Sequence, residues 1–252
     1  MADRRVLSTV VTETAWLTPS MVRVVVGGPD LAGFGAGAFT DHYVKCRFDD
    51  KTRSYTVRAW DPDRCLLTLD FVVHGDRGHA GPWASSAQPG DRLELMGPGG
   101  AYTPSPEADW HLLVGDDSVL PAIAVSLSRI PAGVPVVAVV EVDGPEHRQP
   151  LDSPGELEVV WLDRSAGPGE DPSLQLEAVK ALELPDGRGH AFVHGEATTV
   201  RLVRRHLVLD RGLPTECLSA SGYWKLRRTD EEWRAEKREW LALADADLAG
   251  RT

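Results

Sequence analysis

The hydrophobic pattern changes once along this chain, and that change limits the possible folds more than any other feature. Up to about residue 100, apolar residues fall in six short β-branched segments separated by Gly, Pro and Asp, which indicates an antiparallel barrel. Beyond that point apolar runs alternate with segments of helical periodicity, which indicates βαβ units and a parallel sheet. The barrel segments are RVLSTVVTE (5–13), MVRVVVGG (21–28), HYVKCRF (42–48), RSYTVRAW (53–60), CLLTLDFVV (65–73) and DRLELMG (91–97).

The sequence therefore predicts two domains, a barrel over 1–105 and an α/β domain with a C-terminal helix over 106–252. The boundary is placed in YTPSPEAD, residues 102–109, which contains two prolines. We expect GPGG at 97–100 to be a turn, because it lacks a dinucleotide fingerprint. The strands and helices expected in the second domain are WHLLVGDD (110–117), SVLPAIAVSLSRI (118–130), VPVVAVVEV (134–142), ELEVVWL (156–162), SLQLEAVKALEL (173–184), HAFVHG (190–195), EATTVRLVRRHLVL (196–209), TECLSASG (215–222) and a helix near 230–247.

Charge and cysteine content exclude several classes of function. The chain of 252 residues has a formal net charge of −11. Residues 1–103 hold 11 Lys+Arg and 12 Asp+Glu, and residues 104–252 hold 16 and 26, so most of the charge lies in the second half. Nucleic acid is therefore not an expected partner. Three separated cysteines without a CxxC pair predict no disulfide framework, zinc site or iron–sulfur cluster. With no spanning apolar run and no signal-peptide pattern, we expect a cytoplasmic monomer with no membrane insertion.

The segment RSYTVRAW concentrates residues that suit a flavin dinucleotide. Arg53 has the geometry to pair with a phosphate, Tyr55 to lie against a flat aromatic ring, and Thr56 to reach the ring edge. On a strand, Arg53 and Tyr55 share one face and Thr56 lies opposite. An ordinary barrel strand with solvated arginines explains the same residues, so the segment alone leaves both interpretations open.

A longer set of motifs favours the flavin interpretation. Arg-x-Tyr-Thr resembles the flavin motif of the ferredoxin-reductase-like superfamily. The ordered set RSYTVR, DFVVHGDRGHAGPWASSAQPGDRLELMGPGG, DHYVK (41–45), GDDSVLPAI (115–123), HGEATTVRLVRRHL (194–207) and SGYWK (221–225) resembles the siderophore-interacting protein family of ferric-siderophore reductases. The resemblance implies a FAD-binding barrel of ferredoxin-reductase type and an NAD(P)H-binding α/β domain.

The resemblance also assigns cofactor contacts. For FAD they lie in the RSYT segment, near the end of the DFVVHG strand and in GPWASSA, where the start of a helix suits a pyrophosphate. For the nicotinamide side they lie in GDDS, HGE and SGYW. The implied cofactor-binding residues are Arg53, Ser54, Tyr55, Thr56, Val72, His74, Gly81, Pro82, Trp83, Ala84, Ser85, Asp116, Gly195, Glu196, Tyr223 and Trp224. Ser118 could instead cap a helix, and Trp224 could belong to the core. Arg201, Arg204 and Arg205 could touch a dinucleotide phosphate, but a solvated helix face explains most of them better.

The function that the resemblance implies is electron transfer from NADPH or NADH through FAD to Fe(III) in a siderophore, with release of Fe(II) for iron homeostasis. No catalytic side chain and no resident metal are expected, because the cofactor carries the chemistry. Lys45, Lys225 and Arg227 are the candidate contacts for an anionic ferric siderophore. Many family members have arginine followed by a further basic residue or glycine where this chain has Lys225 and Leu226, which leaves NADPH, NADH or ferredoxin open as the donor. A general flavin reductase that feeds an oxygenase or a small iron–sulfur protein, and a non-catalytic siderophore-binding module, are the alternative functions.

Overall fold

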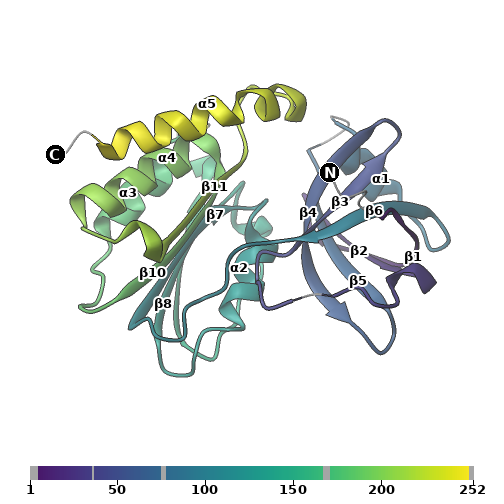
Figure 1. The fold of residues 1–252 in the computed structure, drawn as a ribbon, viewed down its shortest axis with the longest axis horizontal. Coiled ribbons are helices and arrows are strands. Elements are labelled where there is room, and N and C mark those ends of the chain that lie inside the picture. Colours follow the sequence, from purple (N-terminus) through teal and green to yellow (C-terminus); the bar gives the residue numbers. More distant parts are fainter. Residues whose placement is uncertain (1–4, 36, 75–77, 167–170, 250–252) are drawn as a thin grey trace.

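The computed structural model, whose described residues are 5–35, 37–74, 78–166 and 171–249, has two lobes that follow one another along the chain. The first lobe is a closed antiparallel barrel with strand order β1-β2-β5-β4-β3-β6, and the second is a parallel sheet with order β11-β10-β7-β8-β9 (Figure 1). The predicted fold class is thus confirmed. The barrel strands are β1 Leu7–Thr18, β2 Met21–Gly27, β3 Tyr43–Phe48, β4 Lys51–Asp61, β5 Leu66–Val72 and β6 Arg92–Gly99, and helix α1 spans Ala80–Ser86.

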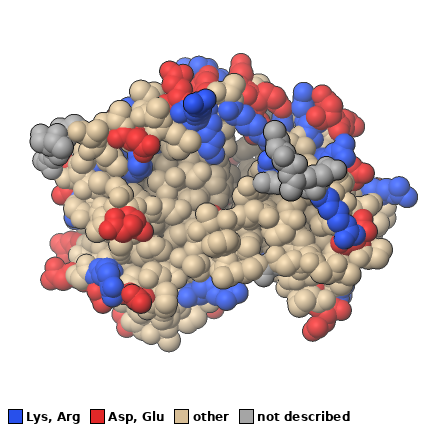
Figure 2. Space-filling model, in the orientation of Figure 1, with Lys and Arg blue, Asp and Glu red and all other residues tan. Residues whose placement is uncertain are grey.

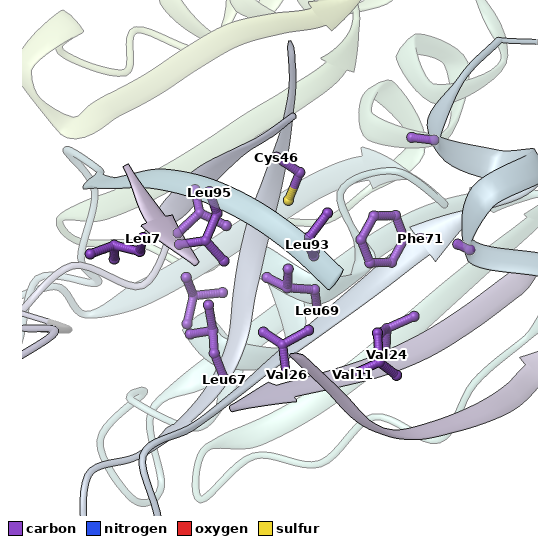
Figure 3. Close-up of a cluster of buried hydrophobic side chains, with 14 of the residues drawn as sticks. Leu7, Val11, Val24, Val26, Cys46, Leu67, Leu69, Phe71, Leu93 and Leu95 are labelled. Carbon is purple, nitrogen blue, oxygen red and sulfur yellow. The ribbon is translucent and has the colours of Figure 1, made fainter. Parts of the chain in front are cut away.

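The barrel closes around an apolar core because alternate residues of every strand point inward. Val, Leu and Phe side chains from all six strands fill it, and α1 covers one end with Ala80 and Ala84. Figure 3 shows a close-up of this cluster of buried side chains. The labelled side chains are Leu7, Val11, Val24, Val26, Cys46, Leu67, Leu69, Phe71, Leu93 and Leu95.

The parallel sheet is covered on both faces, as its continuous apolar strands require. Helix α2 packs between the sheet and the barrel, where it joins a core with Met21 and Tyr102. Helices α3, α4 and α5 lie on the opposite face, with Trp233 and Trp240 of α5 buried against α4 and the sheet (Figure 1). The strands are β7 Trp110–Asp116, β8 Pro135–Val142, β9 Glu156–Asp163, β10 Gly189–Glu196 and β11 Leu218–Trp224; the helices are α2 Leu120–Leu127, α3 Leu174–Ala181, α4 Ala197–Arg205 and α5 Asp230–Ala249.

The order of the parallel strands defines a crevice for ligands. The chain builds β8 and β9 on one side of β7, and then crosses to place β10 and β11 on the other side. Ligands of open α/β sheets bind at the carboxyl ends of strands where this reversal occurs. Here that point lies between the ends of β7 and β10, which carry Asp116 and Glu196.

One local prediction was wrong. The GPGG segment is not a turn, because Gly97, Pro98 and Gly99 continue β6 and Gly99 pairs with Tyr43 of β3. The Tyr43 ring lies over Gly99, where a Cβ atom would come within 2.5 Å of the ring. The glycine therefore lets a strand pass beneath an aromatic side chain. Among the described residues, no helix has the length and hydropathy that a membrane-spanning segment needs.

Candidate functional site

Strand β4 presents its motif residues to two different environments. Tyr55 packs against the barrel core, where its ring lies 4.1 Å from that of Phe71, and its side chain stays partly exposed. Thr56 points the other way and is buried, with its side chain beside Tyr223 of the second lobe. The strand alternation thus places the residues as expected. It makes β4 the wall that the two lobes share.

The Arg53 guanidinium already binds oxyanions. It lies 3.0 Å from the Glu231 carboxylate and 3.2 Å from that of Asp230, both in the first turn of α5. The Arg53 side chain is only 17% exposed, so the guanidinium is held in place at the end of the barrel. Such a planar fork suits phosphate as well as carboxylate oxygens. The structure therefore places a guanidinium that binds anionic groups on strand β4, next to the C-terminal helix.

Helix α1 begins with open backbone N–H groups. The side chain of His79, at the N-cap position, makes no capping hydrogen bond, and the first N–H groups of a helix have no partner within it. Gly81 packs directly on the end of β5, where an added Cβ would lie 3.5 Å from the Val72 carbonyl oxygen. His74 is exposed just beyond that strand. The start of α1 and the end of β5 together form a backbone surface that a phosphate can approach.

The rest of GPWASSA serves the helix and the barrel. The Trp83 ring packs 5.6 Å from that of Phe71, and Ala84 is buried in the same core. The hydroxyl of Ser85 donates to the carbonyl oxygen of Pro82, 2.9 Å away, within the helix itself. Ser85 is thus less available to a ligand than the sequence suggests.

These barrel residues fit a flavin dinucleotide. Uncapped helical N–H groups and a held guanidinium match its pyrophosphate, and Tyr55 supplies an aromatic face beside them. Ser54 lies exposed between Arg53 and Tyr55. The fit rests on the chemistry of these groups and on their common location around β4, β5 and α1.

Asp116 connects three strands at the carboxyl edge of the sheet. Its buried carboxylate accepts hydrogen bonds from the backbone N–H of Glu196 at 3.0 Å and the indole of Trp224 at 2.8 Å. It also accepts from the backbone and hydroxyl of Ser118 at 2.9 and 2.5 Å. Burial, and then the neighbouring Asp117, raises the pKa of Asp116 above its ordinary value. The sequence motifs GDDS, HGE and SGYW therefore meet at a single carboxylate.

Gly195 and Glu196 shape this meeting point. Gly195 has φ +127, and a Cβ there would lie 2.5 Å from an Asp116 oxygen, so only glycine fits without displacement. The Glu196 carboxylate caps α4 by accepting from the backbone N–H groups of Thr198 and Thr199 at 2.6 and 2.9 Å. It also accepts from the Leu226 N–H at 3.1 Å. Glu196 is thus committed to holding the loop after β11 against α4.

A second charged group at this edge escaped the sequence interpretation. Arg164, which follows β9, lies 2.7 Å from Asp117 and 2.9 Å from Asp143, and 3.8 Å from Glu141. Burial raises the pKa of Glu141. The sequence could have indicated this group, because an arginine directly after a predicted parallel strand lies at the edge where the carboxyl ends of such strands meet.

The two lobes meet at Tyr223. Burial is the main cause that raises the pKa of this phenol, and nearby Asp41 and Asp116 add to it. The His194 ring contacts Tyr223 edge-on at 5.2 Å and stacks on Phe192. Burial lowers the pKa of His194 to about 3, so the ring is neutral. A neutral histidine and a neutral phenol therefore occupy the boundary between the flavin strand and the sheet edge.

The candidate substrate residues lie on both sides of this boundary. Lys45 lies half-buried on β3 opposite Ser54, on the same strand face as Tyr43. Lys225 and Arg227 belong to the loop after β11, and Arg227 has a left-handed backbone with φ 61. Figure 2 shows basic side chains, interspersed with acidic ones, around the hollow between the two lobes.

The arginines of α4 have a structural role. Arg201 donates to Asp247 of α5 at 2.8 Å, and Arg204 donates to Asp245 at 2.9 Å. These pairs fasten the C-terminal helix to α4.

Comparison with known proteins extends these observations. Residues 108–227 match the siderophore-interacting protein family, and residues 49–102 match the siderophore-interacting FAD-binding domain. The ferric vibriobactin reductase of Vibrio cholerae is 30% identical over 88% of this chain and 90% of its own. The NADPH-dependent ferric-chelate reductase of Escherichia coli is 26% identical over 80% and 86%. The crystal structure of a siderophore utilization protein from T. fusca superposes with a TM-score of 0.79, at 35% identity, over 91% of this chain and 96% of that one.

Proposed function

Because this chain belongs to the siderophore-interacting protein family, we propose that it is a FAD-dependent reductase that takes electrons from NAD(P)H and reduces the Fe(III) of a bound ferric siderophore. One observation carries this proposal: Val72 at the end of barrel strand β5 and Tyr223 near the end of sheet strand β11 pack against one hydrophobic cluster, which joins the barrel to the carboxyl edge of the parallel sheet. Electron transfer needs a flavin and its donor in contact, and these are the two surfaces that meet. The reductases of V. cholerae and E. coli support the same reaction class.

The barrel is the FAD site of this proposal. Bound FAD supplies the change from a two-electron nicotinamide donor to one-electron transfer. Arg53 and the N–H groups at the start of α1 hold the pyrophosphate, while Tyr55 lies against the ring system. Thr56 is buried against Tyr223, so it positions the junction between the lobes. Val72, His74 and Trp83 enclose the dinucleotide from β5 and α1.

The carboxyl edge of the sheet is the donor site. Asp116 fixes the ends of β7, β10 and β11 relative to one another, and Gly195 lets its carboxylate approach the backbone of β10 closely. Tyr223 and the neutral His194 exclude water from the junction. NADH or NADPH is the donor, with ferredoxin as the alternative; we place the reaction in the cytoplasm and propose that the protein acts as a monomer.

Substrate chemistry explains why no acid–base residue is needed. A siderophore wraps Fe(III) in hard oxygen ligands, and these bind Fe(II) far more weakly. Reduction therefore releases the iron without a protein ligand. The protein contributes charge: Lys45, Lys225 and Arg227 attract the ferric complex to the hollow between the lobes.

The test is an anaerobic spectrum of the purified protein. We expect a flavin absorption that NADH or NADPH bleaches, and that an added ferric siderophore restores. A colourless protein that takes up no FAD would contradict the proposal. If neither NADH nor NADPH reduces the bound flavin, the barrel remains the FAD site and ferredoxin becomes the proposed electron donor. Reduction by NAD(P)H with no response to ferric complexes would favour a general flavin reductase.

A further inference from the structure

The loop after β11 carries a cation pair that one acidic side chain neutralises. Glu236, in the second turn of α5, lies with one carboxylate oxygen 2.6 Å from the Lys225 ammonium and the other 2.6 Å from Nε of Arg228. The side chains of Lys225 and Glu236 are 31% exposed and that of Arg228 is 42% exposed. All three therefore face solvent and any ligand that arrives there.

The structure fixes this loop beside the proposed reaction centre. Tyr223 and Trp224, directly before Lys225, contact Thr56 and Asp116, and the N–H of Leu226 is bound by Glu196. Lys237, the residue after Glu236, donates to the Gly222 carbonyl oxygen at 2.9 Å. The loop and α5 are thus attached to the same strand end.

The ion pairs explain little of the stability at this position. Exposed pairs of this kind stabilise proteins by a small amount, because water solvates both charges well. Hydrogen bonds from Lys225, and then Arg228, lower the pKa of Glu236, so it stays ionised wherever the enzyme works. What Glu236 changes is the potential that a ligand meets, since it removes one of two positive charges from this pair.

We propose that Glu236 sets the charge selectivity of the substrate site, favouring ferric complexes with little net charge, such as trihydroxamates, over tris-catecholates. Each hydroxamate brings one negative charge, so three of them neutralise Fe(III). Each catecholate brings two, so the ferric complex keeps three negative charges. A site that has lost part of its positive charge binds the second class less well. The excess of acidic residues in 104–252 acts in the same direction.

The inference rests on the proposed function, and binding separates it from turnover. Gallium(III) has nearly the size and charge of Fe(III) but is not reduced under these conditions. Gallium trihydroxamate and gallium tris-catecholate are therefore titrated calorimetrically into the FAD-loaded protein. The variant Glu236→Gln removes the charge and keeps the shape. The variant Glu239→Gln is the matched control, since Glu239 is exposed on the same helix and forms no ion pair with any described residue.

We expect Glu236→Gln to lower the dissociation constant of the gallium tris-catecholate on the order of tenfold, and to change that of the gallium trihydroxamate by no more than about twofold. The gain shrinks as salt is added, because the charges are exposed. Glu239→Gln leaves the ratio of the two affinities unchanged. Adding Lys225→Gln to Glu236→Gln returns the tris-catecholate affinity toward that of the parent protein.

Two results would overturn the inference in distinguishable ways. If Glu236→Gln changes the affinity ratio no more than Glu239→Gln, while the parent protein reduces a ferric complex, charge selectivity is set elsewhere and the proposed function stands. If the parent protein binds neither gallium complex and reduces neither ferric complex, the proposed function fails and the inference fails with it.

Discussion

The two surfaces that meet at Thr56 and Tyr223 differ in how their polar groups are used. On the barrel side, the first N–H groups of α1 have no cap, and Arg53 is held by two partly exposed carboxylates. On the sheet side, Asp116 is saturated with hydrogen bonds from its own protein. On the barrel side a ligand can therefore compete with partly exposed carboxylates for Arg53, whereas the sheet edge uses buried groups to hold its own shape.

This difference matches two kinds of ligand. A resident cofactor is retained by many direct, charge-assisted contacts, and the barrel offers them. A donor that arrives and leaves in every cycle needs a rigid surface with modest affinity, because tight binding would slow its release. We therefore propose that the barrel retains FAD and that the sheet edge receives the nicotinamide.

The largest effect is expected where the sheet edge loses its central acceptor. Asp116→Ala leaves the Glu196 N–H and the Trp224 indole buried without partners, which lowers the free energy of unfolding by about 3 kcal/mol. Urea unfolding monitored by tryptophan fluorescence measures it. Asp152→Ala, in an exposed loop of the same lobe, is the control and should change the stability little. Equal effects of the two variants would show that the edge is not held through Asp116.

The next effect belongs to the barrel and concerns binding. Arg53→Ala removes the guanidinium from the proposed pyrophosphate site, and we expect the FAD dissociation constant to rise about 30-fold, or about 2 kcal/mol. Arg53→Lys recovers part of this affinity, because an ammonium keeps the charge but not the fork. Arg47→Ala is the control. Arg47 lies on the neighbouring strand β3, and the substitution removes its surface ion pair with Glu94 of β6. Unchanged FAD affinity in Arg53→Ala would place the pyrophosphate elsewhere.

A third experiment asks whether buried polar groups also have hydrogen-bond partners at the other end of the parallel sheet. At the amino end of the same sheet, neither ring nitrogen of the buried His111 has a hydrogen-bond partner among the described residues. Burial, and then His190, lowers the pKa of His111 to about 4 from an unfolded value near 6.5. The unfolded chain therefore binds the proton more readily, and stability falls as the pH drops from about 6.5 toward 4.

Replacing His111 by phenylalanine removes this titration while keeping a ring of similar shape. Between pH 7 and pH 5.5 the variant should lose about 1 kcal/mol less unfolding free energy than the parent protein. Denaturant unfolding at both pH values measures the difference. Equal pH dependence in the two proteins would mean that His111 has a partner in solution.

The smallest effect separates backbone from side chain in α1. Because the Ser85 hydroxyl donates to its own helix, Ser85→Ala should change FAD binding by less than about 0.5 kcal/mol, roughly twofold. Fluorescence titration of the apoprotein with FAD gives the value. A tenfold loss would show that this hydroxyl leaves Pro82 and binds the phosphate.

The sequence predicted the barrel side better than the sheet side, for a physical reason. Arg53, Tyr55 and Thr56 lie within four positions of one strand, so alternation alone places their side chains. Asp116, Gly195 and Trp224 are far apart in the chain, and only the strand order brings them together. Single residues could be named there, but not the bonds between them.

Other features were beyond local patterns altogether. Arg164 forms ion pairs with Asp117, Glu141 and Asp143, and these pairs depend on where β8 and β9 end relative to β7. The contact of Arg53 with Asp230 and Glu231 depends on how α5 crosses the molecule to reach the barrel. Both are long-range consequences of packing, and an acidic first turn on a helix does not reveal its partner.

The measurement that tests the account most directly compares two affinities on one protein. The dissociation constant of FAD is measured on the apoprotein by quenching of flavin fluorescence, and that of the nicotinamide donor on the FAD-loaded protein under oxidised conditions. The account predicts that FAD binds at least about tenfold more tightly than NADH or NADPH. FAD that binds as weakly as the donor, and exchanges freely during turnover, would contradict the division between a retaining barrel and a transient sheet edge.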